Sequence, residues 1–137
     1  MGNPSQNDGA VYSAKLDGSD VQTVVASGDV HTPKQCVVDQ QAEKLYFCDR
    51  EGMRVMRVNL DGSDLETIVQ NGDWRTDGII DQLKWCVGIA VSQQSRKVFW
   101  TQKGYSKAGT GKIHAVSLDM PKGKSPISGH TVRPHVD

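Results

Sequence analysis

Short runs of alternating apolar and polar residues, separated by turns, occupy most of this chain and predict β-strands. The clearest runs are 35–40 (QCVVDQ), 44–49 (KLYFCD), 86–92 (CVGIAVS) and 97–102 (KVFWTQ). The second and fourth runs are dense in aromatic and aliphatic side chains, and a short polar turn joins each pair. The same pair of strands therefore occurs twice along the chain. A further strand is expected at 112–119.

A five-residue block, LDGSD, occurs at 16–20 and again at 60–64. It lies within longer similar segments, 10–25 and 54–69, which are identical at about half of their positions. Their spacing of about 44 residues is found in propeller blades and in helical arrays. The β-rich pattern favours propeller blades over helical arrays, and the Asp-Gly pair suits a tight hairpin turn because it tolerates positive φ. The repeat therefore predicts a chain of β-hairpins.

With the strands of each four-stranded unit labelled a to d from the centre outward, the chain reads c-d, then a-b-c-d, then a-b-c. This order resembles the YWTD-repeat, LDL-receptor class B-like family of six-bladed β-propellers. Residues 46–49 (YFCD) and 99–102 (FWTQ) stand at the motif position, 88–92 (GIAVS) matches the inner strand, and the LDGSD hairpins match the outer pair. Stretches such as GNPSQNDG and KWCVGIAVSQQSRKVFWTQKG further resemble stand-alone intracellular propellers of filamentous fungi, including hetero-Diels–Alderases of tropolone–sesquiterpenoid pathways.

The fold class that follows is all-β: a β-propeller of four-stranded blades, of which this chain supplies about three blades of a six-bladed ring. We expect a partial propeller over residues 1–119 and a Pro/Gly-rich tail over 120–137, to which one further edge strand could belong. A six-bladed ring needs roughly 240–270 residues. Either copies of the chain complete the ring or the sequence is a piece of a longer protein. Self-association is the favoured expectation because closed assembly covers open sheet edges.

Composition and charge narrow the expected partners. Sixteen basic and sixteen acidic residues leave no net charge, which argues against nucleic acid or a membrane surface as a partner. The first residues lack the apolar region of a signal peptide, and no apolar run could span a bilayer. The three cysteines show no metal-ligand spacing and are expected to be small buried residues in a reducing compartment. A cytoplasmic location, no metal and no cofactor are therefore predicted.

The loops from strand d to the next strand a, and from strand b to strand c, should meet on one face of the propeller. Aromatic walls with a few convergent polar groups suit a small ligand, so a small apolar or aromatic substrate is expected there. The candidate catalytic residues, as donors to a carbonyl oxygen, are Arg50, Lys103 and His31. The candidate substrate-binding residues are Gln35, Asp49, Trp85, Gln102 and Tyr105.

Other roles remain open for several of these residues. Asp49 could be a structural carboxylate that binds backbone N–H groups between blades, Arg50 could pair with Glu51, and Trp100 could belong to the core. His130 and His135, in the tail, are expected to have no role. The resemblance favours a pericyclase that guides cycloaddition of a quinone methide with an alkene. The alternatives are a non-catalytic interaction or scaffold propeller and a metal-dependent, lactonase-like hydrolase.

Overall fold

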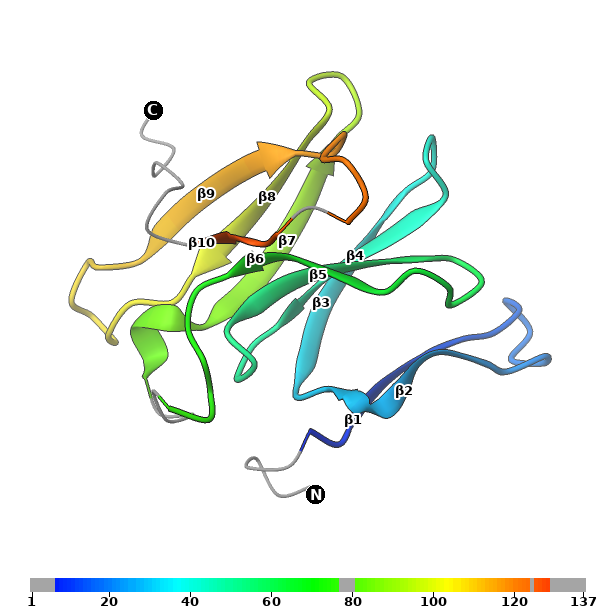
Figure 1. Ribbon diagram of the computed structural model, residues 1–137, viewed down its shortest axis with the longest axis horizontal. Helices are drawn as coiled ribbons and strands as arrows, with labels where there is room; N and C mark the ends of the chain where they lie inside the picture. The colour runs from blue at the N-terminus through cyan, green and yellow to red at the C-terminus, as the bar shows by residue number, and fades with distance from the viewer. Residues whose placement is uncertain (1–6, 77–80, 124, 129–137) are drawn as a thin grey trace.

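Three β-sheets stand side by side like the blades of a fan in the computed structural model (Figure 1). The structure describes residues 7–76, 81–123 and 125–128. Within these ranges the secondary structure consists of ten strands and one short 3-10 helix, which confirms the predicted all-β class. His130 and His135 lie outside the described residues.

Within the described ranges, no helix has the length and apolar character that crossing a membrane requires.

The strand bounds follow the hydrophobic pattern, and three of the five expected runs have the predicted ends. The first sheet contains β1 (Gly9–Ser13) and β2 (Gln22–Val30); the second contains β3 (Pro33–Asp39), β4 (Lys44–Asp49), β5 (Arg54–Asn59), β6 (Glu66–Gln70) and β10 (Ile127–Ser128); the third contains β7 (Cys86–Ser92), β8 (Lys97–Gln102) and β9 (Lys112–Ser117), preceded by the helix η1 (Gln82–Lys84).

The strand order within the sheets is that of consecutive propeller blades. Strands β3, β4, β5 and β6 pair antiparallel in sequence and form one four-stranded blade, a-b-c-d. Strands β1 and β2 are the outer pair of the preceding blade, and β7, β8 and β9 are the first three strands of the following one. The chain is thus a partial β-propeller of about three blades. In the tail, β10 pairs parallel with β6 of the middle blade and does not lie beside β9.

The two LDGSD blocks fold into the same turn. In each block the backbone N–H of the serine donates to the first aspartate, Asp17 or Asp61, over 2.9 Å. These hydrogen bonds, with those from the serine hydroxyls, lower the pKa of both aspartates. Gly18 and Gly62 have φ of 85° and 89°, which a residue with a Cβ rarely adopts. In the first copy residues 14–21 connect β1 to β2, so the loop is longer than the expected tight turn. Inside it the Gly18 N–H donates to the Lys15 carbonyl over 2.8 Å, and the Lys15 N–H donates to the Ser19 carbonyl over 2.9 Å.

Strand β4 is buried on both of its faces, which explains why its sequence is apolar almost throughout. Tyr46 and Cys48 pack toward the following blade, in a cluster that includes Trp100. Leu45 and Phe47 face the other way and pack against the preceding blade. The middle blade is therefore held between its two neighbours, and burial of these apolar side chains is the main force that holds the blades together.

Polar contacts also join the middle and following blades. The Tyr46 hydroxyl donates to the Leu118 carbonyl over 3.1 Å. Arg96 donates to both carboxylate oxygens of the fully buried Asp39, each over 3.0 Å, and to the exposed Asp119 over 2.9 Å. Because these groups lie on two different sheets, they fix the blades relative to each other at the end opposite the candidate site.

Candidate functional site

Three loops meet around the Trp85 side chain on one face of the partial propeller. The Arg50 guanidinium carbon, from the loop between β4 and β5, lies 4.8 Å from the Trp85 ring centroid. The Lys103 Nζ, from the loop between β8 and β9, lies 5.5 Å from the same centroid. Both distances are within the range of cation–π attraction. The structure therefore brings together three candidate residues that are far apart in the sequence.

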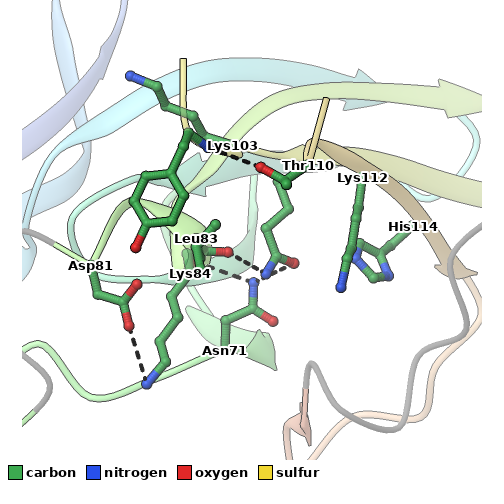
Figure 2. Close-up of a pocket in the computed structure, with 10 residues that line it drawn as sticks. Asn71, Asp81, Leu83, Lys84, Lys103, Thr110, Lys112 and His114 are labelled. Carbon is green, nitrogen blue, oxygen red and sulfur yellow. Dashed lines mark hydrogen bonds and ion pairs between the residues drawn. The ribbon is translucent and has the colours of Figure 1, made fainter. Parts of the chain in front are cut away.

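A pocket of about 470 Å³ opens on this face between the middle and following blades. Figure 2 shows its walls: the segment around η1 on one side, the loop after β8 above, and the start of β9 opposite. Of the candidates, Gln102, Lys103 and Tyr105 line it. The full lining is Asn71, Asp81, Leu83, Lys84, Gln102, Lys103, Tyr105, Thr110, Lys112 and His114.

Side-chain amides hold the inner end of the pocket. The Gln102 Nε2 donates to the Leu83 carbonyl over 2.6 Å, and its Oε1 accepts a hydrogen bond from the Asn71 Nδ2 over 3.0 Å. The Asn71 Nδ2 also lies 3.3 Å from the Lys84 carbonyl. These contacts connect the end of β6, the segment around η1 and the end of β8. They position the pocket walls before any ligand binds.

The pocket carries more positive than negative charge. Lys84, Lys103 and Lys112 line it together with one carboxylate, Asp81, whose Oδ2 lies 3.6 Å from the Lys84 Nζ. The buried His114 ring stacks on Trp100, with ring centroids 5.2 Å apart. The lining of the pocket suits a ligand with an apolar body and an oxygen-rich or anionic group.

Arg50 is held beside Trp85 by its neighbour Glu51. Its Nε donates to the Glu51 Oε1 over 2.9 Å, and the Thr32 hydroxyl donates to the other carboxylate oxygen. Burial opposes ionisation of Glu51, but the hydrogen bonds from Arg50 and Thr32 outweigh it and lower its pKa. Arg50 is therefore both paired with Glu51 and in contact with the aromatic ring.

Asp49 is fully buried, and its carboxylate binds groups of the protein itself. It accepts hydrogen bonds from the backbone N–H of His31 over 3.1 Å, the backbone N–H of Thr32 over 2.6 Å and the Arg54 Nε over 2.7 Å. A Cβ at Gly52 would collide with this carboxylate, so glycine leaves the space that Asp49 needs. Asp49 thus joins the first and middle blades, which is the structural role left open by the sequence.

His31 and Gln35 lie apart from the pocket. The His31 side chain is buried and contacts the Trp74 ring, with centroids 4.8 Å apart, and neither of its ring nitrogens has a hydrogen-bond partner among the described residues. Gln35 is exposed on β3, and its Oε1 would lie 3.4 Å from a Cβ at Gly88 on β7. It therefore sits on the inner strands, beside the centre of the propeller.

The cysteines differ from one another in burial. Cys48 and Cys86 are buried, as expected, whereas Cys36 on β3 is exposed, so that expectation was wrong for one residue. Burial raises the pKa of Cys48 to about 12, with a smaller contribution from Asp49. Among residues 7–76, 81–123 and 125–128, no three His, Cys, Asp or Glu side chains gather as a metal site would require.

Seven of the ten lining residues were not among the candidates: Asn71, Asp81, Leu83, Lys84, Thr110, Lys112 and His114. Lys112 and His114 alternate along β9 with the same period as the buried Leu118, so strand periodicity could have placed them on the face that turns toward the middle blade. Asn71 follows β6 in a polar loop, and nothing in the sequence distinguishes it from its neighbours.

Comparison with known proteins supports the propeller assignment. The chain is 46% identical over 126 residues to the 3-hydroxyacyl-CoA dehydrogenase-like protein LAM1 of Cochliobolus heterostrophus, a match that covers 91% of this chain and 26% of that protein. It is 44% identical over 141 residues to the low-density lipoprotein receptor-related protein 1 of Pyricularia oryzae, covering 97% of this chain and 43% of that protein. No family model matches the chain.

A solved structure shares the fold. The structure described as a nidogen/laminin complex superposes with a TM-score of 0.59 and 17% identity, over 80% of this chain and 36% of that one. The chain thus spans less than half the length of the proteins that it matches. The structural match shows that this chain has a β-propeller fold, and the sequence similarity includes a protein named as a low-density lipoprotein receptor-related protein.

Proposed function

We propose that this chain forms part of a small-molecule-binding propeller, and that its loop face guides the cycloaddition of a conjugated carbonyl compound with an alkene. The observation that carries the proposal is that Arg50 and Lys103 both contact the Trp85 ring, and that Lys103 also lines a pocket of about 470 Å³. Pockets of this size enclose ligands of a few hundred daltons. The resemblance to fungal hetero-Diels–Alderases points to the same chemistry.

The cycloaddition would use the site to orient two reactants and to stabilise charge. In a quinone methide the methide carbon and the carbonyl oxygen each form a bond to one alkene carbon, while the conjugated π electrons shift and no atom is lost. Negative charge gathers on the oxygen if the two bonds form unequally. A cation such as Arg50 or Lys103 near that oxygen would lower the barrier, because it binds the transition state more strongly than the reactant.

The aromatic side chains would serve orientation. A planar reactant could stack on Trp85 or Tyr105, and Tyr105 is 57% exposed at the pocket. Holding two reactants in one geometry replaces a bimolecular encounter by an effectively unimolecular step. Neither contribution needs a nucleophile or a proton transfer.

The test is product analysis with a quinone methide generated in situ and a humulene-type alkene. We expect wild-type protein to change the ratio of cycloadducts relative to buffer. Lys103→Ala is expected to lower turnover about 30-fold or more, which corresponds to one lost transition-state contact of on the order of 2–4 kcal/mol. Trp85→Ala should instead reduce stereoselectivity. Lys97→Ala is the matched control, because Lys97 is exposed at the other end of β8. A wild-type product mixture identical to that in buffer would contradict the catalytic proposal.

A second candidate is a non-catalytic interaction propeller. The names of two matched proteins favour it, since one is called a receptor-related protein and the other is described as part of a nidogen/laminin complex. LAM1, by contrast, carries the name of a dehydrogenase-like protein. An inactive protein that still binds small molecules at the pocket would favour a ligand-binding role, whereas one that binds none would favour the interaction propeller.

A further inference from the structure

One buried polar atom in the pocket has no partner in the protein. Asn71 is 8% exposed, and its side-chain oxygen, Oδ1, accepts no hydrogen bond among the described residues. A buried acceptor of this kind costs stability unless another group, such as a ligand or a water molecule, satisfies it. Asn71 lines the same pocket as Lys112 and Tyr105.

The hydrogen-bond network fixes which end of the Asn71 amide faces the pocket. The Gln102 Nε2 donates to the Leu83 carbonyl, so its Oε1 is the end that faces Asn71. The Asn71 group that meets this oxygen must be the NH2 donor. The same nitrogen lies 3.3 Å from the Lys84 carbonyl, a second acceptor. Turning the amide over would place two acceptors against its oxygen, so the Oδ1 stays free for a donor.

The opposite wall supplies positive charge. In Figure 2 the Asn71 amide oxygen points away from the hydrogen bonds that the amide nitrogen donates. It points toward the side of the pocket where Lys112 and His114 lie. Lys112 and His114 occupy alternate positions of β9, and both line the pocket. The buried Asn71 Oδ1 and the cation Lys112 therefore belong to opposite walls of the pocket, with Leu83 and Tyr105 as apolar surface. Lys84, Lys103 and Asp81 also line the pocket.

We propose that this pocket selects an aromatic acid that also carries a hydroxyl or N–H donor away from its acidic group. The donor binds the Asn71 Oδ1, the acidic oxygens face Lys112, and the ring lies against Tyr105. This inference rests on the proposed small-molecule function of the same pocket and names its ligand class. An acceptor at a fixed position discriminates strongly, because a ligand without the donor leaves the Asn71 oxygen buried and unpaired.

The test compares three ligands on the wild-type chain by calorimetry or NMR titration: 3-hydroxybenzoate, 3-methoxybenzoate and benzoate. They share the acid and the ring, and only the first has a hydroxyl donor. We expect 3-hydroxybenzoate to bind about fivefold more tightly than either of the others, the effect of one hydrogen bond to a buried acceptor. Equal affinities would overturn the proposal, because they would mean that a water molecule or nothing at all satisfies Asn71.

Two variants separate the acceptor from the cation. Lys112→Gln should weaken all three ligands by about threefold and leave their ratio unchanged, whereas the control Lys97→Gln should change nothing. Asn71→Ala should bring the fivefold ratio close to one. If Asn71→Ala does not fold, as judged by its melting curve, the wild-type ligand comparison decides. If none of the three acids binds, this inference is overturned, while the cycloaddition proposal is judged separately by its product ratio.

Discussion

Replacing the buried Asp49 by asparagine should destabilise the fold strongly, because its carboxylate joins two blades. The carboxylate accepts hydrogen bonds from two backbone N–H groups and from the Arg54 guanidinium, at 2.6–3.1 Å. In Asp49→Asn one acceptor oxygen becomes an NH2 group, which faces a donor, and Arg54 loses its buried counter-charge. Removing one partner of a buried charge pair typically costs about 3–5 kcal/mol. This is a large share of the 5–15 kcal/mol that stabilises an ordinary domain.

The assay is urea unfolding followed by tryptophan fluorescence, with the free energy of unfolding extrapolated to water. Asp119→Asn is the matched control. Asp119 is 62% exposed, and its partner Arg96 keeps both hydrogen bonds to Asp39. An exposed pair contributes no more than about 1 kcal/mol, so this variant should unfold close to wild type. An Asp49→Asn chain that is unfolded in buffer agrees with the prediction. A loss below about 1 kcal/mol, equal to that of the control, would refute a structural role for Asp49.

Three further predictions concern thiols, acid and assembly. In the folded protein Cys36 should react rapidly with a thiol reagent at pH 7, whereas Cys48 and Cys86 should react only on unfolding, because burial raises their pKa; simultaneous labelling of all three would contradict this. Asp39 and Glu51 have lowered pKa values in the fold, so the unfolded chain binds protons first as the pH falls. The stability that these two carboxylates contribute should therefore be fully present above about pH 5 and be lost below about pH 4, as pH-dependent melting can show; unchanged melting between pH 5 and pH 3 would argue against these ion pairs. We also propose that the chain self-associates through edges such as that of β9, so sedimentation should yield particles larger than 15.0 kDa; a folded monomer would exclude it.

The fold could be predicted from the sequence because its signals are local and repeated. The paired strand runs carry the strand pattern, and the two LDGSD blocks mark turns. The structure has strands at the runs and on either side of each block. The ends of β4, β7 and β8 agree with the predicted ones. The parallel pairing of β10 with β6 could not be predicted, because it depends on where a distant segment returns to the sheet.

The candidate site could be predicted only in part, because burial of a loop side chain depends on its neighbours from other blades. Arg50, Trp85 and Lys103 meet as the blade geometry required. His31 is buried against the Trp74 ring instead of facing the pocket, and that contact cannot be read from the sequence. Asn71 gives no sequence signal, since only the three-dimensional network with Gln102 fixes its amide and leaves its oxygen free.

The central claim is that the loop face between the middle and following blades binds small molecules. Amide NMR of the wild-type chain titrated with 3-hydroxybenzoate tests it most directly. We expect saturable shifts concentrated at Asn71, 83–85 and 102–112. We expect none at the LDGSD turns, 16–20 and 60–64, which connect strand c to strand d of their blades. Shifts that cluster at those turns, or that never saturate, would contradict the assignment of this face as the binding site.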